Sequence, residues 1–172
     1  VARMAARRIG DPTDPATEVG PLAYAALRDE LQAQVTASVR RGARILLGGT
    51  PAPGPGFFYP PTVLTDVAPG MPAFDEEMFG PVAAIISVRD EAEAVRVAND
   101  SAFGLGAVLF TRSRARARRL IPQIAAGTVA VNDFVRSDPA LPFGGVKQSG
   151  YGRELGVWGL RAFQNIKTVW GA

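Results

Sequence analysis

The sequence contains neither cysteine nor histidine. Without cysteine, the chain has no disulfide, no thiolate nucleophile and no Cys-based metal site. Without histidine, it can build neither a Ser-His-Asp triad nor an imidazole metal site, and no side chain titrates near neutral pH unless its environment perturbs it. Chemistry is therefore left to carboxylates, Lys and Arg, hydroxyl groups and the backbone, which is a poor set for a self-sufficient enzyme.

Long apolar runs are also missing, because none approaches the roughly 18 residues that a membrane span needs. The hydrophobic share of 47% and the charged share of 20% are typical of a globular protein, and 172 residues fit one domain with at most a small appendage. The net charge of +3 is only a mild bias towards anionic partners. Residues 1–9 are too short and too rich in arginine for a secretory signal, so we expect a cytoplasmic protein without a membrane partner.

The apolar pattern predicts an α/β protein. Strand, helix, strand, helix and strand follow one another between residues 82 and 131, and this order is typical of two βαβ units in a parallel sheet covered by helices. Asp90 and Ser113 are expected to cap two of the helices, and Pro122 to shorten the last turn of the second. The predicted helices lie between 21 and 42, at 90–99, at 113–127 and at 153–163; the predicted strands are 43–47, 62–67, 81–88, 107–110, 128–131 and 166–170.

An acidic segment comes directly before the predicted strand 81–88. It holds Asp75, Glu76 and Glu77, followed by Phe79 and a Gly-Pro turn. Ligands of parallel α/β proteins gather at loops around strand ends, so a carboxylate here could bind sugar hydroxyls. The alternative is a solvated acidic turn, which the physical properties of the residues alone favour.

A glycine-rich segment covers residues 141–154. Its spacing matches neither a Rossmann turn nor a P-loop, so it is not interpreted as a phosphate cradle. Long loops of this composition within a domain are often functional. A surface crossing whose glycines only permit positive φ angles is the equal alternative.

The most basic stretch of the chain has no aromatic residue between its arginines. We interpret it as a solvated helix face rather than a nucleic-acid patch, so no nucleic-acid partner is expected. The arginines are Arg112, Arg114, Arg116, Arg118 and Arg119.

Several segments, taken in order, resemble signatures of the aldehyde dehydrogenase superfamily. The resemblance covers essentially all 172 residues, and the final part is most similar to bacterial succinate-semialdehyde dehydrogenases. The segments that carry it are Ile9-Gly10-Asp11-Pro12, Val19-Gly20-Pro21-Leu22, Glu-Glu-Met-Phe-Gly-Pro-Val at 76–82, Asn-Asp-Ser-Ala-Phe-Gly-Leu at 99–105, Ala-Gly-Thr-Val-Ala-Val-Asn at 126–132, Pro-Phe-Gly-Gly at 142–145, and the stretches 137–143 and 165–170.

By matching position, the resemblance implies roles for four residues. Glu77 would accept hydrogen bonds from the ribose hydroxyls beside the nicotinamide of NAD or NADP, and Phe79 would pack nearby. Leu105 would lie near the nicotinamide end, and Phe143 would line the tunnel for a small aldehyde substrate. No catalytic residue and no metal ligand is carried over.

The resemblance also implies parts that would precede Val1: a Rossmann domain for NAD(P), a nucleophilic cysteine, a glutamate that activates water, and an oligomerisation arm. We therefore expect residues 1–163 to be the C-terminal part of a catalytic domain and residues 164–172 to be an oligomerisation strand of a homo-oligomer. The complete enzyme would oxidise an aldehyde, by this resemblance succinate semialdehyde, to a carboxylic acid, while the chain alone would be inactive without the thiolate. The alternative is a non-catalytic remnant that acts as an assembly or interaction module.

Overall fold

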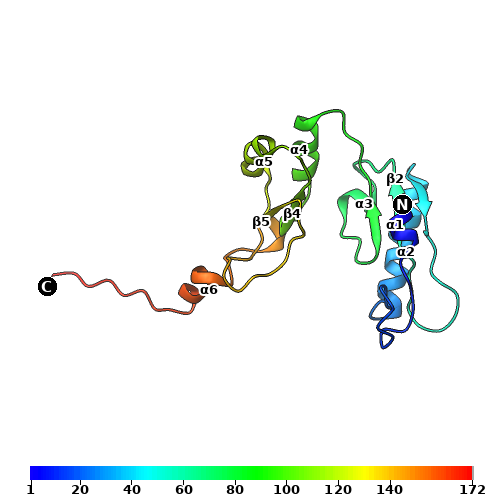
Figure 1. Cartoon of the computed structure of the whole chain (residues 1–172), viewed down its shortest axis with the longest axis horizontal. Coiled ribbons are helices and arrows are strands. Elements are labelled where there is room, and N and C mark those ends of the chain that lie inside the picture. Colours follow the sequence, from blue (N-terminus) through cyan, green and yellow to red (C-terminus); the bar gives the residue numbers. More distant parts are fainter. Residues whose placement is uncertain (172) are drawn as a thin grey trace. The chain divides into compact units, whose positions relative to one another are not determined.

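A computed structural model describes residues 1–171 (Figure 1). The chain divides into two units, an N-terminal unit, Val1–Ser87, and a C-terminal unit, Val88–Ala172. Each contains its own small sheet, three-stranded in the first and two-stranded in the second. The expected α/β class is confirmed, but the strands form two separate sheets instead of the single parallel sheet that was expected.

The N-terminal unit is built around a mixed sheet with the strand order β1-β2-β3. β1 pairs antiparallel with β2, and β2 pairs parallel with β3 in the register Thr62↔Val82 to Leu64↔Ala84. Pro60 and Pro61 lie just before β2, where no ladder hydrogen bond is lost. The elements are α1 (Ala2–Ala5), α2 (Ala25–Arg40), β1 (Arg44–Leu47), β2 (Thr62–Thr65), α3 (Pro72–Asp75) and β3 (Val82–Ala84).

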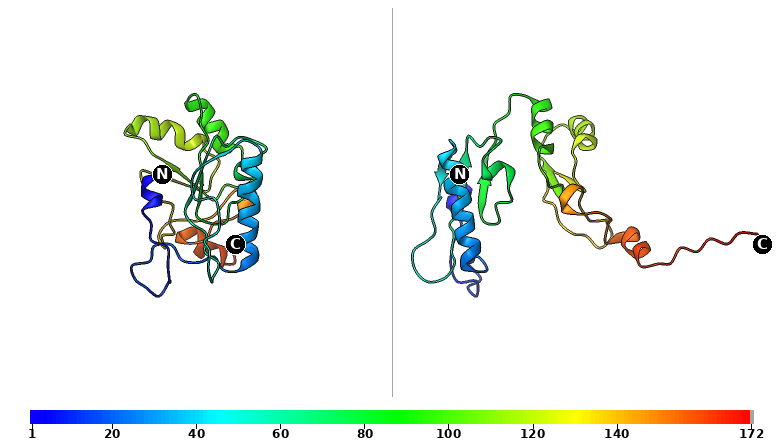
Figure 2. Two further views of the ribbon diagram at one scale, coloured as in Figure 1. Left: turned by 90° about the vertical axis from the view of Figure 1, so that its right-hand side faces the viewer. Right: turned by 180° about the vertical axis from the view of Figure 1, so that it is seen from behind.

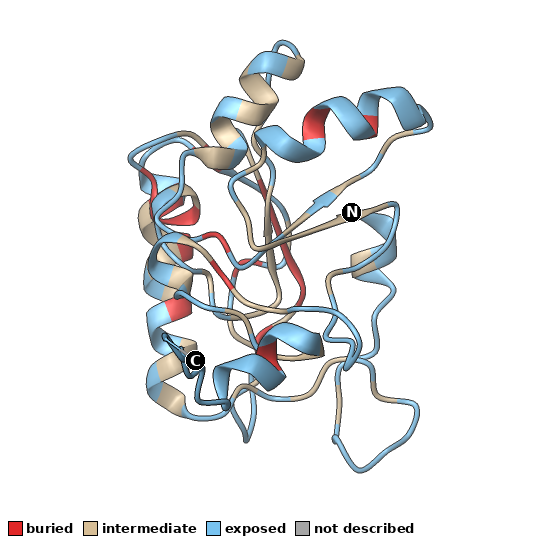
Figure 3. Cartoon of the chain, turned by 90° about the vertical axis from the view of Figure 1, so that its left-hand side faces the viewer, coloured by how far each residue is buried: buried red, intermediate tan, exposed pale blue. Residues whose placement is uncertain are grey.

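Helix α2, the long helix of this unit (Figure 2), buries one face in the core (Figure 3). Leu31, Val35 and Ser38 recur at helical spacing and are all buried. Leu31 and Val35 pack in one cluster with Tyr59 and Leu64, which are 1% and 0% exposed. The Tyr59 hydroxyl donates to Gln32 Oε1 at 3.0 Å, and burial raises its pKa to about 12. The core therefore joins the helix to the central strand.

Replacing Leu64 by alanine is expected to lower the free energy of unfolding of the N-terminal unit by about 2–5 kcal/mol, because the side chain is fully buried and its loss leaves a cavity. Leu46→Ala on β1, where the side chain is 43% exposed, is the matched control and should cost much less. Hydrogen exchange of the α2 and β2 amides at increasing urea concentration measures both. Equal losses in the two variants would contradict this account of the core.

The predicted strand 81–88 pairs differently from the expectation. β3 lies beside β2, and the pairing continues past its end, because Ile85 N donates to Leu64 O at 2.9 Å. In the described residues no ladder joins β3 to β4, so the first of the two expected βαβ units is not formed. The residues of β3 are half-buried and Ile85 is 42% exposed. β3 forms its backbone hydrogen bonds with β2. An apolar pattern can indicate a strand, but it does not specify which other strand becomes its neighbour.

The C-terminal unit contains the second βαβ unit as expected. β4 and β5 pair parallel from Gly106↔Thr128 to Leu109↔Val131, with α5 as the crossover. The side chain of Asp90 accepts from Glu93 N at 2.8 Å and that of Ser113 from Arg116 N at 3.2 Å, so both predicted caps are confirmed. The elements are α4 (Glu91–Asn99), β4 (Gly106–Leu109), α5 (Arg114–Leu120), η1 (Ile121–Gln123), β5 (Thr128–Val131), η2 (Lys147–Ser149) and α6 (Gly156–Ala162).

The last described residues, 164–171, form no strand, contrary to the expectation for 166–170. They run out from α6 as an extended segment (Figures 1 and 2) in which Ile166, Val169 and Trp170 are 86%, 77% and 96% exposed. A β-strand needs a neighbouring strand for its backbone hydrogen bonds, and the described chain places none beside this segment. The oligomerisation strand therefore stays a prediction about an assembly.

Candidate functional site

The acidic segment forms the turn between α3 and β3. Glu77 and Phe79 are both exposed to solvent, Phe79 to 61%. The turn passes very close to α2 at Gly80, where an added Cβ would lie 2.3 Å from Cδ2 of Leu31. A larger residue at position 80 would therefore displace the Leu31 side chain, so the turn lies directly against the core while the side chains of Glu77 and Phe79 stay accessible.

Helix α2 also binds this turn through polar groups. Gln34 Nε2 donates to Glu76 Oε2 at 2.9 Å and to the Glu77 carbonyl at 3.2 Å. Ser38 Oγ, which is fully buried, accepts from Ala73 N at 2.9 Å and donates to the Gln34 carbonyl at 2.8 Å. No motif in the sequence marks Gln34 or Ser38 as part of this site, since a polar residue on a helix carries no local signal of a partner about 40 residues away.

The segment with Leu105 is fixed by the end of α4. Asn99 Nδ2 donates to the Gln123 carbonyl at 2.7 Å, and Asn99 Oδ1 accepts from Ala125 N at 2.8 Å. Lys147 Nζ donates to the carbonyls of Asn99 and Ser101 at 2.7 and 2.9 Å. The glycine-rich segment is thereby tied to the residues just before Leu105.

A second close approach joins the glycine-rich segment to the start of β5. A Cβ at Gly127 would lie 1.6 Å from the carbonyl oxygen of Gly144, so no other residue fits there. Gly104 N, two residues before β4, donates to Ser149 Oγ at 2.9 Å. The segment is therefore packed against the start of the sheet and is not a loose surface crossing, while its functional role stays a prediction.

Phe143 lies at the point where the glycine-rich segment doubles back. It exchanges two backbone hydrogen bonds with Glu154, both at 2.8 Å. Its half-buried ring and Leu105 line the same pocket of about 440 Å³, together with Ser149 and Arg153. The structure thus brings together two of the four predicted site residues, Leu105 and Phe143. Glu77 and Phe79 share the turn before β3 in the other unit.

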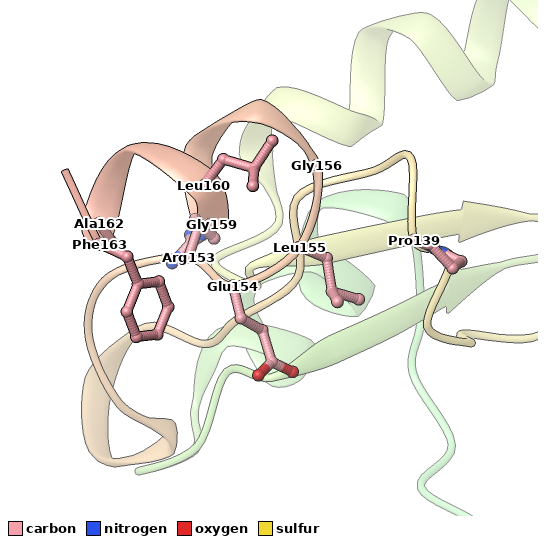
Figure 4. A pocket seen from close by; sticks show the side chains of 9 residues that line it. All are labelled: Pro139, Arg153, Glu154, Leu155, Gly156, Gly159, Leu160, Ala162 and Phe163. Carbon is pink, nitrogen blue, oxygen red and sulfur yellow. The ribbon is translucent and has the colours of Figure 1, made fainter.

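Another pocket, which the sequence analysis did not anticipate, lies beside α6 and has a volume of about 620 Å³. Pro139, Leu155 and Leu160 give it an apolar lining, and Arg153 and Glu154 are its charged members (Figure 4). The guanidinium of Arg153 donates hydrogen bonds to the carbonyls of Gly145 and Gly152, at 2.9 and 2.6 Å. The pocket is therefore apolar in character, with no catalytic constellation.

Four of the five arginines of the basic stretch lie on α5, where Ala117 and Leu120 are buried and the arginines are exposed; Arg112 comes before the helix and is also exposed. Arg116 and Arg119 both pair with Glu91 at the start of α4. Two of these arginines thus form ion pairs within the C-terminal unit, which agrees with the interpretation of the stretch as a helix face.

Within residues 1–171, no helix is long and apolar enough to cross a membrane. The same part of the chain contains no group of three or more acidic side chains close enough to hold a metal ion.

Comparison with known proteins agrees with the motifs. Residues 1–169 match the model of the aldehyde dehydrogenase family, and the chain belongs to that family. It is 53% identical over 170 residues to a protein of Mycobacterium bovis named succinate-semialdehyde dehydrogenase [NADP(+)] 1. The aligned region covers 99% of this chain and 37% of that relative. The chain thus spans little more than a third of the length of the curated relatives it matches.

Solved structures show the same fold. The succinic semialdehyde dehydrogenase from Streptococcus pyogenes in complex with NADP+ matches with a TM-score of 0.90 at 38% identity, over 94% of this chain and 36% of that one. An aldehyde dehydrogenase of Mycobacterium tuberculosis complexed with NAD+ matches with a TM-score of 0.87 at 39% identity, over 93% of this chain and 33% of that one. The family therefore includes relatives that bind either cofactor.

Proposed function

We propose that this chain forms part of an NAD(P)-dependent aldehyde dehydrogenase that oxidises succinate semialdehyde to a carboxylic acid. The observation that carries this proposal is the 53% identity to a succinate-semialdehyde dehydrogenase over 99% of the chain. The chain would supply residues to the cofactor and aldehyde sites. The thiolate would come from the part of the enzyme that the relatives have in addition, because this sequence has no cysteine.

The turn before β3 has groups that suit a nicotinamide cofactor. Glu77 offers an exposed carboxylate, which is an acceptor for the paired hydroxyls of a ribose, and Phe79 offers an exposed ring to pack beside the nicotinamide. When bound, the cofactor supplies the hydride acceptor. The role of this chain is to hold the ribose through Glu77 and to limit movement of the ring through Phe79.

The pocket of Leu105 and Phe143 suits a small aldehyde. Both side chains present apolar surface, and the backbone just before Leu105 is held by Lys147, which donates to the Asn99 carbonyl, and by Ser149, which accepts from Gly104 N. We assign Leu105 to the nicotinamide end and Phe143 to the path of the aldehyde. An apolar wall excludes water from the reacting carbonyl and packs against the carbon chain of the substrate.

A second candidate function is a non-catalytic interaction module. The observation that favours it is the apolar surface of residues 164–171, where Trp170 is 96% exposed. Such a module would bind other copies of the chain and would need neither Glu77 nor Phe143.

A chimaera separates the two candidates. In it, this chain replaces the matching 170 residues of the Mycobacterium bovis relative, which supplies the rest of the enzyme. We expect the chimaera to oxidise succinate semialdehyde with NADP+. A folded chimaera that binds NADP+ but produces no succinate would contradict the proposed enzymatic role and support the interaction module.

Replacing Glu77 by glutamine in the chimaera is expected to slow the hydride-transfer step by on the order of 100-fold, because an acceptor displaced by about 1 Å loses the reactive geometry. Asp75→Asn, an exposed acidic residue in the same stretch, is the matched control and should leave the step unchanged. Single-turnover kinetics measure the step directly. An unchanged rate in Glu77→Gln would rule out the assigned contact.

A further inference from the structure

Gln34 is the side chain that links α2 to the turn carrying Glu77. Its amide nitrogen has two hydrogens, and the structure gives each an acceptor: Glu76 Oε2 at 2.9 Å and the Glu77 carbonyl at 3.2 Å. The two acceptors belong to neighbouring residues, so one side-chain group fixes both a carboxylate and the backbone next to it.

The turn is held on either side of this contact as well. Ahead of it, the buried hydroxyl of Ser38 accepts from Ala73 N, and after it Gly80 lies against Leu31. Leu31, Gln34 and Ser38 are spaced by three and four residues, so they share one face of α2. Gln34 thus acts at the middle of a turn that is anchored on the same helix by a hydrogen bond at one end and by packing at the other.

The contact also distinguishes two adjacent carboxylates. Glu76 and Glu77 are both exposed, and either could accept a hydrogen bond from a hydroxyl. Gln34 occupies the carboxylate of Glu76, whereas no donor within residues 1–171 is bonded to the carboxylate of Glu77. The amide therefore leaves Glu77 available and restrains its neighbour.

We propose that Gln34 is a positioning residue: it holds Glu76 and the backbone of Glu77 so that the carboxylate of Glu77 faces the ligand. This inference rests on the proposed cofactor role of Glu77. Without the amide, the middle of the turn loses its two hydrogen bonds, and the carboxylate of Glu76 is free to compete for the same hydroxyls.

Two substitutions separate hydrogen bonding from packing. Gln34→Met keeps a side chain of similar length without a donor, and Gln34→Lys keeps the donor. In the 172-residue chain, we expect amide hydrogen exchange at residues 76–80 to become about tenfold faster in Gln34→Met, the effect of one hydrogen bond to a charged group, and to stay near the parent rate in Gln34→Lys. Unchanged exchange in the β2 amides shows that the core is intact, and Glu30→Gln on an exposed site of α2 is the control.

The chimaera supplies the functional measurement. We expect the KM for NADP+ to rise about tenfold in Gln34→Met and to return to within about twofold of the parent in Gln34→Lys, because the lysine ammonium also donates to Glu76. In a Glu77→Gln background, Gln34→Met should add no further loss, since the residue acts through Glu77.

The two arms fail in different ways. Exchange at 76–80 that is equal in the parent and Gln34→Met overturns the positioning role, as does a KM that rises equally in Gln34→Met and Gln34→Lys. If Glu77→Gln leaves the KM for NADP+ unchanged while exchange responds to Gln34→Met, the proposed cofactor contact is the part that is overturned, and the hold of Gln34 on the turn stands.

Discussion

The 172-residue chain by itself is expected to show no oxidation of succinate semialdehyde with either NAD+ or NADP+. Aldehyde oxidation in this family requires, by the resemblance, a thiolate that adds to the carbonyl carbon before hydride leaves. The sequence has no cysteine to provide it and no histidine to activate another nucleophile. A hydroxyl group without a base is far too weak a nucleophile at neutral pH to replace it. The expected effect is therefore complete loss, measured as absorbance of the reduced cofactor against a blank.

The matched comparison is the active chimaera, which differs by the added part of the Mycobacterium bovis relative. Hydrolysis of an activated ester serves as a second readout, because it also needs the thiolate but not the cofactor. We expect the 172-residue chain to show no activity in either assay and the chimaera to be active in both. Turnover by the purified chain above the blank would show that a group within these 172 residues performs the chemistry.

The isolated chain is expected to associate into a dimer or larger assembly, and removal of residues 165–172 should reduce that association. Ile166, Val169 and Trp170 are almost fully exposed, and the segment presents unpaired backbone groups beside them. Apolar surface combined with free N–H and C=O groups favours pairing with another chain, and a two-fold pair is the simplest closed arrangement. Light scattering at increasing chain concentration measures the mass of the assembly.

A substituted tail controls for the loss of length. Changing Ile166 and Trp170 to serine keeps all 172 residues and should weaken association nearly as much as the deletion, whereas Lys167→Gln should not. The alternative is a tail that merely frays in solvent. A monomer at high micromolar concentration with the tail intact would support that alternative and refute the prediction.

Much of the secondary structure could be predicted because its causes are local. Asp90 and Ser113 cap their helices as expected, and α5 ends at Leu120, where Pro122 lies in the following 3₁₀ turn. The βαβ unit from β4 to β5 was also anticipated, since apolar strands separated by an amphipathic helix allow few other arrangements. The strand at 166–170 was not formed, because a strand depends on a neighbour that its own residues do not specify.

For the candidate site, too, some features could be predicted from the sequence and others only from the structure. Glu77, Phe79, Leu105 and Phe143 were named from motifs, and their roles remain predictions. The structure adds that Leu105 and Phe143 line one pocket and that Gln34 holds the turn of Glu77. Gln34 and Glu76 are 42 residues apart, so no periodicity or motif in the sequence connects them.

The sequence by itself determined the positions of the caps, the amphipathic faces of the helices and the lack of a thiolate, because each depends on residue identity or on spacing within a few turns of chain. Only the tertiary structure decided that β3 pairs with β2, that α2 supports the acidic turn, and that the glycine-rich segment packs against the start of β5 at Gly127. These contacts join residues far apart in the chain. Burial and hydrogen bonding within each folded unit decide which residues make these contacts, and the local sequence pattern specifies neither.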